Sequence, residues 1–342
     1  MRHQKKRWFA ASLVLCMLLS ILPSTSLAFS ESEETWSGNR RNQTIDGGTH
    51  IITLSNLTID SPGVEKSAID ITGNADVTFI LEGNNTLRGY RNHPAIWVES
   101  GSSVTFEGNG LLEASAGGAS IGLGAAGIGG GYGASSNFGN ITINGGTIIA
   151  RGSGGGAGIG GGYEVGSGTV TGNVTINGGY VTAIGGSSGS TGGAGIGSGE
   201  NANYSGTVTI NGGVVYAEGG ADSTSIGRGN RAIGTSDNGA FTTGTGGNAV
   251  IVAPDGIGDP SGFADWDGIF ISYEGSNTSA TVGEDGTVHL NDTEANIQVW
   301  GEPVIDYPLV VESGTELRVV QNDRNYAYAT LEIGQDGKLT NN

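Results

Sequence analysis

The sequence predicts an all-β protein folded as a right-handed parallel β-helix, a three-sided solenoid that ends in irregular β coils or a cap. Three observations lead to this prediction. A unit of 33 or 34 residues recurs along the chain, glycine supplies 66 of the 342 residues, and apolar and polar residues alternate in short runs. No helical periodicity appears beyond the first segment of the chain.

The first 28 residues have the pattern of a secretory signal peptide. Four basic residues precede an apolar run at residues 8–22, and small residues before position 28 suit a signal peptidase. We therefore expect a secreted protein, cleaved after Ala28, with no integral membrane segment left. An uncleaved membrane anchor is the alternative, although a run of about 15 apolar residues is short for a membrane span. The single cysteine, Cys16, lies in this segment, so no disulfide or thiol chemistry is expected in the mature chain.

Each repeat contains three short runs that suit β-strands. The first run ends in Asn-Gly-Gly and occurs at residues 140–146, 173–179 and 207–213. A second alternating run follows each of these at once. The third run has the pattern Ala-Gly-Ile-Gly and begins at residues 126, 157 and 194. Three strands per unit, separated by turns, predict a coil with three sides.

One strand of four residues is too short to bury its apolar side chains. Stacking the equivalent strands of successive repeats would bury them against each other. In the Val-Thr-Ile run the side-chain period is two, so Ile143, Ile176 and Ile210 should face inward. The threonines at 142, 175 and 209 should then face solvent. We expect the asparagines that follow, at 144, 177 and 211, to form a hydrogen-bonded column, with successive coils about 4.8 Å apart.

Weaker copies of the repeat extend toward the N-terminus. Residues 68–71 and 95–98 occupy the place of Ala-Gly-Ile-Gly, and residues 79–83 and 104–108 occupy the place of Val-Thr-Ile-Asn-Gly. We expect the β-helix to cover residues 29–247 and an irregular β region, a continuation or a cap, to cover 248–342. An open end of stacked strands favours aggregation. A truncated chain, or one that has lost an anchoring module, is therefore expected.

The repeat units resemble those of a known group of proteins. The Ala-Gly-Ile-Gly-Gly-Gly and Val-Thr-Ile-Asn-Gly-Gly units, with residues 79–87 upstream, are similar to Gly-rich β-helical segments of large secreted bacterial surface proteins. Those proteins are often described as carbohydrate-binding or adhesin-like. The resemblance spans roughly residues 50–248 and implies the fold and a surface location. No sorting motif or surface-layer repeat is present to indicate how this chain would be attached.

The charge of the chain limits its partners. The 33 acidic and 15 basic residues give a net charge of −18, which repels nucleic acid and anionic lipid. A neutral glycan or cell-surface polysaccharide suits such a surface. No cofactor is expected. The acidic turns near Asp255 and Asp265 are typical of surface turns, with a structural Ca²⁺ as the alternative.

Catalytic patterns are weak in this chain. A β-helix also hosts polysaccharide lyases and glycoside hydrolases, but the Asp-Asp, Gly-His-Gly and Arg-x-Lys strings of such enzymes are missing. The histidines of the mature chain, His50, His93 and His289, lie in different predicted coils. An unfamiliar carboxylate pair for glycoside hydrolysis stays open as an alternative. We therefore assign no catalytic residue.

Aromatic residues are the best candidates for ligand contact. Tyr132 and Tyr163 occupy the same position in successive repeats and should stack, and Tyr90 and Trp97 lie close to His93 and to two arginines, Arg88 and Arg91. Aromatic faces beside polar groups suit sugar rings, whereas a structural aromatic ladder is the plainer interpretation. The sequence thus favours a secreted, non-catalytic surface or matrix protein for carbohydrate binding or adhesion. The alternatives are a β-helical lyase or hydrolase and a structural spacer of a larger surface protein.

Overall fold

The computed structural model describes residues 33–60, 65–118, 123–166, 168–230 and 249–258, together with further strands between 238 and 341. The expected signal peptide, residues 1–28, lies outside the described residues. The described strands all belong to one compact unit, Glu33–Asn342. The fold is all-β, and a short 3-10 turn, η1 (Gly133–Ser135), is the one helical element among the described residues. None of the described residues form a helix that is long and apolar enough to cross a membrane.

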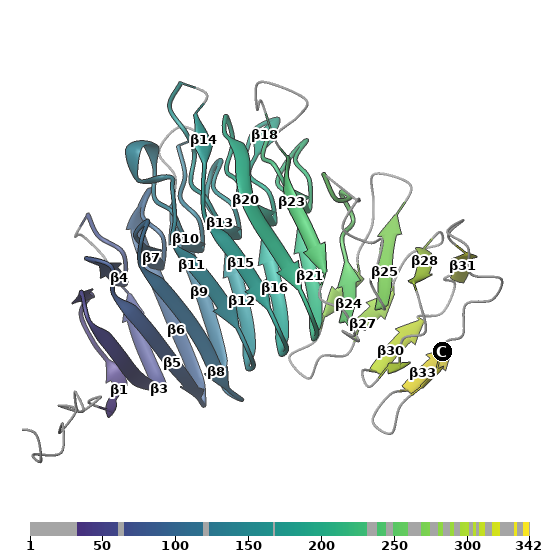
Figure 1. The fold of residues 1–342 in the computed structure, drawn as a ribbon, viewed down its shortest axis with the longest axis horizontal. Coiled ribbons are helices and arrows are strands. Elements are labelled where there is room, and N and C mark those ends of the chain that lie inside the picture. Colours follow the sequence, from purple (N-terminus) through teal and green to yellow (C-terminus); the bar gives the residue numbers. More distant parts are fainter. Residues whose placement is uncertain are drawn as a thin grey trace, which may run out of the picture. The chain divides into compact units, whose positions relative to one another are not determined.

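Each repeat adds one strand to each of three columns of parallel strands. Figure 1 shows the strands of successive repeats next to one another, for example β12 (Thr147–Arg151), β16 (Tyr180–Ile184) and β21 (Val214–Glu218). The first and second columns belong to one large sheet, and the third forms a seven-stranded sheet. The first column contains β1 (Glu33–Asn39), β3 (Thr49–Asp60), β5 (Asp76–Glu82), β8 (Ser103–Gly108), β11 (Asn140–Ile143), β15 (Asn173–Ile176), β20 (Asn203–Ile210) and β23 (Asn238–Thr243).

The second column begins with the C-terminal part of β3. It continues with β6 (Asn84–Arg91), β9 (Leu111–Gly117), β12 (Thr147–Arg151), β16 (Tyr180–Ile184), β21 (Val214–Glu218), β24 (Ala249–Val252) and β25 (Gly268–Tyr273). The third column contains β2 (Gln43–Asp46), β4 (Ile69–Thr72), β7 (Ile96–Val98), β10 (Ile128–Gly129), β13 (Ile159–Gly160), β19 (Ile196–Gly197) and β22 (Ile226–Gly227).

The register of the first column confirms the predicted stacking of the Asn-Gly-Gly units. β11 pairs with β15, and β15 with β20, in parallel and with equivalent residues opposite each other. The Nδ2 of Asn177 donates to the Oδ1 of Asn144 at 2.9 Å, and that of Asn211 donates to Asn177 at 2.7 Å. The asparagine column is therefore a hydrogen-bonded ladder that fixes the register between repeats.

Burial follows the period of two that the sequence predicts. Ile143, Ile176 and Ile210 are fully buried. The threonine that directly precedes each of them on its strand is partly exposed. Larger rings fill the core at other levels, where Phe79 and Phe106 lie 5.9 Å apart between centroids. Because every repeat adds one such apolar layer, the core is continuous along the columns.

Glycines let the third column pack closely. A Cβ on Gly129 would lie 2.1 Å from the carbonyl oxygen of Gly160, and one on Gly160 would lie 1.9 Å from that of Gly197. The φ angles of these glycines lie between +128° and +138°, a range that side chains rarely tolerate. In the earlier repeats Asp70 and Trp97 occupy the register position of Gly129. This position therefore carries a side chain in the earlier repeats and none in the later ones.

One upstream alignment from the sequence is wrong by two residues. β5 pairs with β8 so that Phe79 lies opposite Phe106 and Leu81 opposite Gly108. The copy therefore begins at Val77 and not at Phe79. A shift of two residues keeps the same side chains facing inward, so alternation alone does not separate the two registers. The upstream copies at 68–71 and 95–98 are aligned with each other as predicted. Their predicted alignment with Ala-Gly-Ile-Gly is wrong by one residue, because Ile96 pairs with Ile128 and Trp97 with Gly129.

The pairing pattern changes after β24, in the region expected to be irregular. β25 continues the second column in parallel but pairs on its other side with β28 (Ala295–Trp300) in antiparallel orientation. The other strands here are β26 (Ala280–Val282), β27 (Val288–Leu290), β29 (Val304–Ile305), β30 (Pro308–Val311), β31 (Leu317–Gln321), β32 (Glu332–Ile333) and β33 (Lys338–Asn341). Small elements elsewhere are β14 (Thr169–Val170) and the hairpin of β17 (Ser187–Ser188) with β18 (Thr191–Gly192).

Candidate functional site

The end of β6 approaches its neighbour unusually closely. The register between β6 and β9 is irregular between Arg88 and Arg91. A Cβ on Gly117 of β9 would lie 2.2 Å from the carbonyl carbon of Tyr90, so this position requires glycine. Arg88 lies before the irregularity, opposite Ser115, and Arg91 lies after it, at the last position of β6 and opposite Gly117.

The turn between β6 and β7 carries several polar residues. The His93 N–H donates to the carbonyl oxygen of Tyr90 at 2.7 Å and closes the turn. Asn92 has a φ of 58°, and asparagine tolerates this left-handed conformation better than most residues. Pro94, which is buried, then leads into the third column. This turn therefore places Arg91 and His93 close to Trp97.

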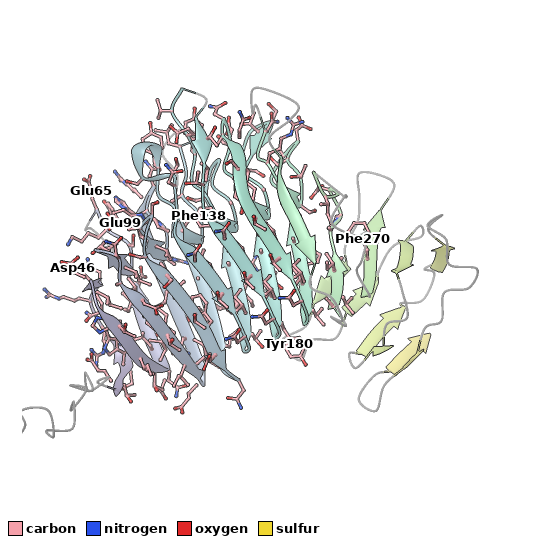
Figure 2. The ribbon with its side chains drawn as sticks, in the orientation of Figure 1. Asp46, Glu65, Glu99, Phe138, Tyr180 and Phe270 are labelled. Carbon is pink, nitrogen blue, oxygen red and sulfur yellow. The ribbon has the colours of Figure 1, made fainter. Side chains whose placement is uncertain are left out.

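A pocket of about 430 Å³ opens beside this turn. Trp97 of β7 and Tyr132, which precedes η1, supply its aromatic lining. Its polar lining comes mainly from Arg91, His93 and Glu65, and Figure 2 shows Glu65 at the outer edge of the ribbon. The pocket thus combines two aromatic side chains with an acid, a base and an imidazole.

Tyr132 is supported by the equivalent residue of the next repeat. The rings of Tyr132 and Tyr163 are stacked, with centroids 5.8 Å apart and an interplanar angle of 26°. The hydroxyl of Tyr163 accepts a hydrogen bond from the Nδ2 of Asn201 at 2.8 Å. A Cβ on Gly155 would lie 2.9 Å from the Tyr163 ring. Tyr163 is therefore packed on both sides and lies behind Tyr132, outside the pocket lining.

Two titratable groups near the pocket are affected by burial. Burial raises the pKa of the Asp70 carboxyl, an effect that Lys66 and His93 partly offset. Burial lowers the pKa of His93, and the negative charges of Asp70 and Glu65 oppose this change. The balance of these effects favours the neutral imidazole of His93. It can then donate or accept a hydrogen bond at the pocket.

The indole N–H of Trp97 is buried and finds no acceptor among the described residues. Trp97 lies opposite Asp70 in the parallel register of β4 and β7. An unsatisfied buried donor is uncommon in folded proteins.

The structure brings two of the four predicted site residues into one pocket. Tyr132 and Trp97 line it together, although they come from different repeats. The predicted stacking of Tyr132 on Tyr163 is confirmed. Tyr90 lies beside the pocket, where the guanidinium carbon of Arg91 is 5.8 Å from the centroid of its ring.

Sequence reasoning missed several residues of this site. Glu65 and Ser135 line the pocket, and Asp70 lies against its wall opposite Trp97. Asp70 could have been found, because the repeat alignment places it at the same position as Trp97 in the preceding coil. Glu65 and Ser135 lie in turns outside the repeated strands, and no pattern pointed to them.

The alternative of a structural Ca²⁺ finds no cluster of ligands in the part of the chain that the structure describes. No group of three or more His, Cys, Asp or Glu side chains there is suitable for a metal ion. Asp255 accepts a hydrogen bond from the N–H of Gly219 at 2.9 Å. The second acidic turn, near Asp265, lies outside the described residues.

Comparison of the chain with models of protein families, with curated proteins and with solved structures found no match.

Proposed function

We propose that this protein is a secreted, non-catalytic surface or matrix protein that binds carbohydrate in the pocket between Trp97 and Tyr132. The observation that carries the proposal is the meeting of these two aromatic side chains with Arg91, His93 and Glu65 in one pocket. Aromatic side chains offer a flat apolar surface to the C–H face of a sugar ring. The polar groups beside them suit sugar hydroxyls.

The size of the pocket supports a small ligand. Its volume of about 430 Å³ lies within the range of about 300–1,000 Å³ that is usual for small-molecule sites. The stack with Tyr163 holds the ring of Tyr132 in place before any ligand binds. A preorganised aromatic wall lowers the entropic cost of binding.

We also propose that the three columns wind as a right-handed parallel β-helix, a three-sided solenoid. The equal registers of the three columns and the short turns between them support this. Such a scaffold would display the turns around Arg91 and Tyr132 on one edge. The pattern of residues 1–28 supports export to the cell surface or the medium, where glycans would be the partners.

A glycan array probed with the full mature chain tests the proposed function. The strongest ligand is then titrated by calorimetry against Tyr132→Ala and against Tyr180→Ala as the matched control. Tyr180 is partly exposed on β16, and Figure 2 places it at the opposite side of the ribbon from Glu65. We expect Tyr132→Ala to weaken binding at least about tenfold, or about 1.4 kcal/mol. Tyr180→Ala should bind normally.

Three outcomes would overturn the proposal. An equal loss in both variants would mean that tyrosine removal disturbs the whole scaffold and that Tyr132 has no special role. Release of reducing ends from a polysaccharide by the wild type would instead identify a lyase or a glycoside hydrolase. If no glycan on the array binds, a structural spacer becomes the better description.

A further inference from the structure

The pocket contains a basic group without an acidic partner. Among the described residues Arg91 forms no ion pair, and its guanidinium lies over the ring of Tyr90, 5.8 Å from the centroid. A guanidinium held over an aromatic ring keeps its N–H groups available in its own plane. Those N–H groups match the two oxygens of a carboxylate.

Two carboxylates lie near Arg91, those of Glu65 and Asp70. Asp70 is buried; burial raises the pKa of its carboxyl, and a hydrogen bond with Ser67 opposes this change. The charge of Glu65 acts on His93 from the pocket side. Neither forms an ion pair with Arg91 in the part of the chain that is described.

Basic residues also gather at this end of a strongly acidic chain. The Tyr90 N–H donates to the carbonyl oxygen of Lys66 at 3.0 Å, which joins the segment of Lys66 to the segment of Arg88 and Arg91. The whole chain has only 15 basic residues against 33 acidic ones. The segments around the pocket thus carry three basic side chains, Lys66, Arg88 and Arg91, beside two acidic ones, Glu65 and Asp70.

The net charge limits the kind of anion that suits the pocket. A chain of net charge −18 repels a long polyanion at a distance. The net charge repels a single carboxylate much less than a long polyanion. At short range, the hydrogen bonds and the positive charge of one arginine can overcome this weaker repulsion. A pocket of about 430 Å³ also suits one or two sugar rings rather than a long chain.

On this basis we propose that the carbohydrate ligand carries an isolated carboxylate, as in a terminal uronic acid on an otherwise neutral glycan, and that Arg91 binds this carboxylate while Trp97 and Tyr132 pack against the ring. The proposal rests on the proposed function and adds the class of sugar. Glu65, on the same pocket, opposes the carboxylate and limits the affinity.

The test uses disaccharides that end in glucuronic, galacturonic or mannuronic acid, each with its carboxyl-reduced neutral counterpart and a glucosamine-terminated disaccharide. Binding to the full mature chain is measured by calorimetry. We expect at least one acid to bind about fivefold or more tighter than its reduced counterpart. Arg91→Gln should remove this difference, and Glu65→Gln should enlarge it. Arg88→Gln, an equal loss of charge on the exposed part of β6, is the matched control and should keep the difference.

The outcomes separate this inference from the proposed function. Equal binding of an acid and its neutral counterpart would overturn the carboxylate proposal and leave glycan binding intact. Preference for glucosamine, lost in Glu65→Gln, would identify a cationic ligand and also overturn it. An equal effect of Arg88→Gln and Arg91→Gln would reduce the role of Arg91 to general charge. A failure of every disaccharide here and of every glycan on the array would overturn both proposals.

Discussion

Replacement of Ile176 by alanine tests the stacking of the repeats most simply. Ile176 is fully buried and lies in register between Ile143 and Ile210. The change removes three carbon atoms from the core, at about 0.8 kcal/mol each. The neighbouring coils are fixed by backbone hydrogen bonds and by the asparagine ladder, so the cavity closes only in part. We therefore expect a loss of about 3–4 kcal/mol in the free energy of unfolding.

The assay is urea denaturation of the full mature chain, followed by far-UV circular dichroism. Thr175→Ala is the matched control, because Thr175 lies next to Ile176 on the same strand but is partly exposed. It should cost well under about 1 kcal/mol. If Thr175→Ala proved the more destabilising of the two, the assignment of inward and outward faces would be refuted.

Three further predictions concern the pocket wall, a buried carboxyl and the glycine column. Tyr163→Ala should weaken glycan binding about fivefold, because Tyr132 loses the ring that supports it; Tyr163→Phe, which keeps the ring, should bind within about twofold of wild type by calorimetry. Asp70→Asn should raise the free energy of unfolding at pH 7. Burial raises the pKa of Asp70 above 3.8, so its carboxyl stabilises the fold at low pH, and this contribution is lost as the pH rises through the folded-state pKa. The advantage of the variant should therefore shrink in denaturation curves below about pH 4, and a constant advantage would contradict the assignment. Gly160→Ala should cost more than about 2 kcal/mol in urea melts, since its Cβ would lie 1.9 Å from the carbonyl oxygen of Gly197; a neutral effect would mean that the column is looser than described.

The sequence predicted the stacked core well, because equal strands recur at nearly equal spacing. The inward position of Ile143, the outward position of Thr142 and the ladder of Asn144 all follow from a period of two and from the repeat length. The upstream register around Phe79 was missed by two residues. Side-chain alternation is unchanged by such a shift, and only the length of the following turn decides it.

The part of the candidate site that lies at equivalent repeat positions could be predicted from the sequence. The stacking of Tyr132 on Tyr163 follows from their equal positions in the repeat. The pocket itself depends on turns that do not repeat, where a close approach at Gly117 and a left-handed residue set the direction of the chain. The repeat alignment gives the position of Asp70 opposite Trp97, whereas the placement of Glu65 has no local sequence signal.

A crystal structure of the mature chain with the strongest glycan of the array is the most direct test of the central claim. The account predicts a sugar ring packed against Trp97 and Tyr132, with carbon atoms within about 4.5 Å of both rings, and a carboxylate or hydroxyl oxygen bonded to Arg91. A glycan bound on another face, with this pocket filled only by solvent, would contradict it.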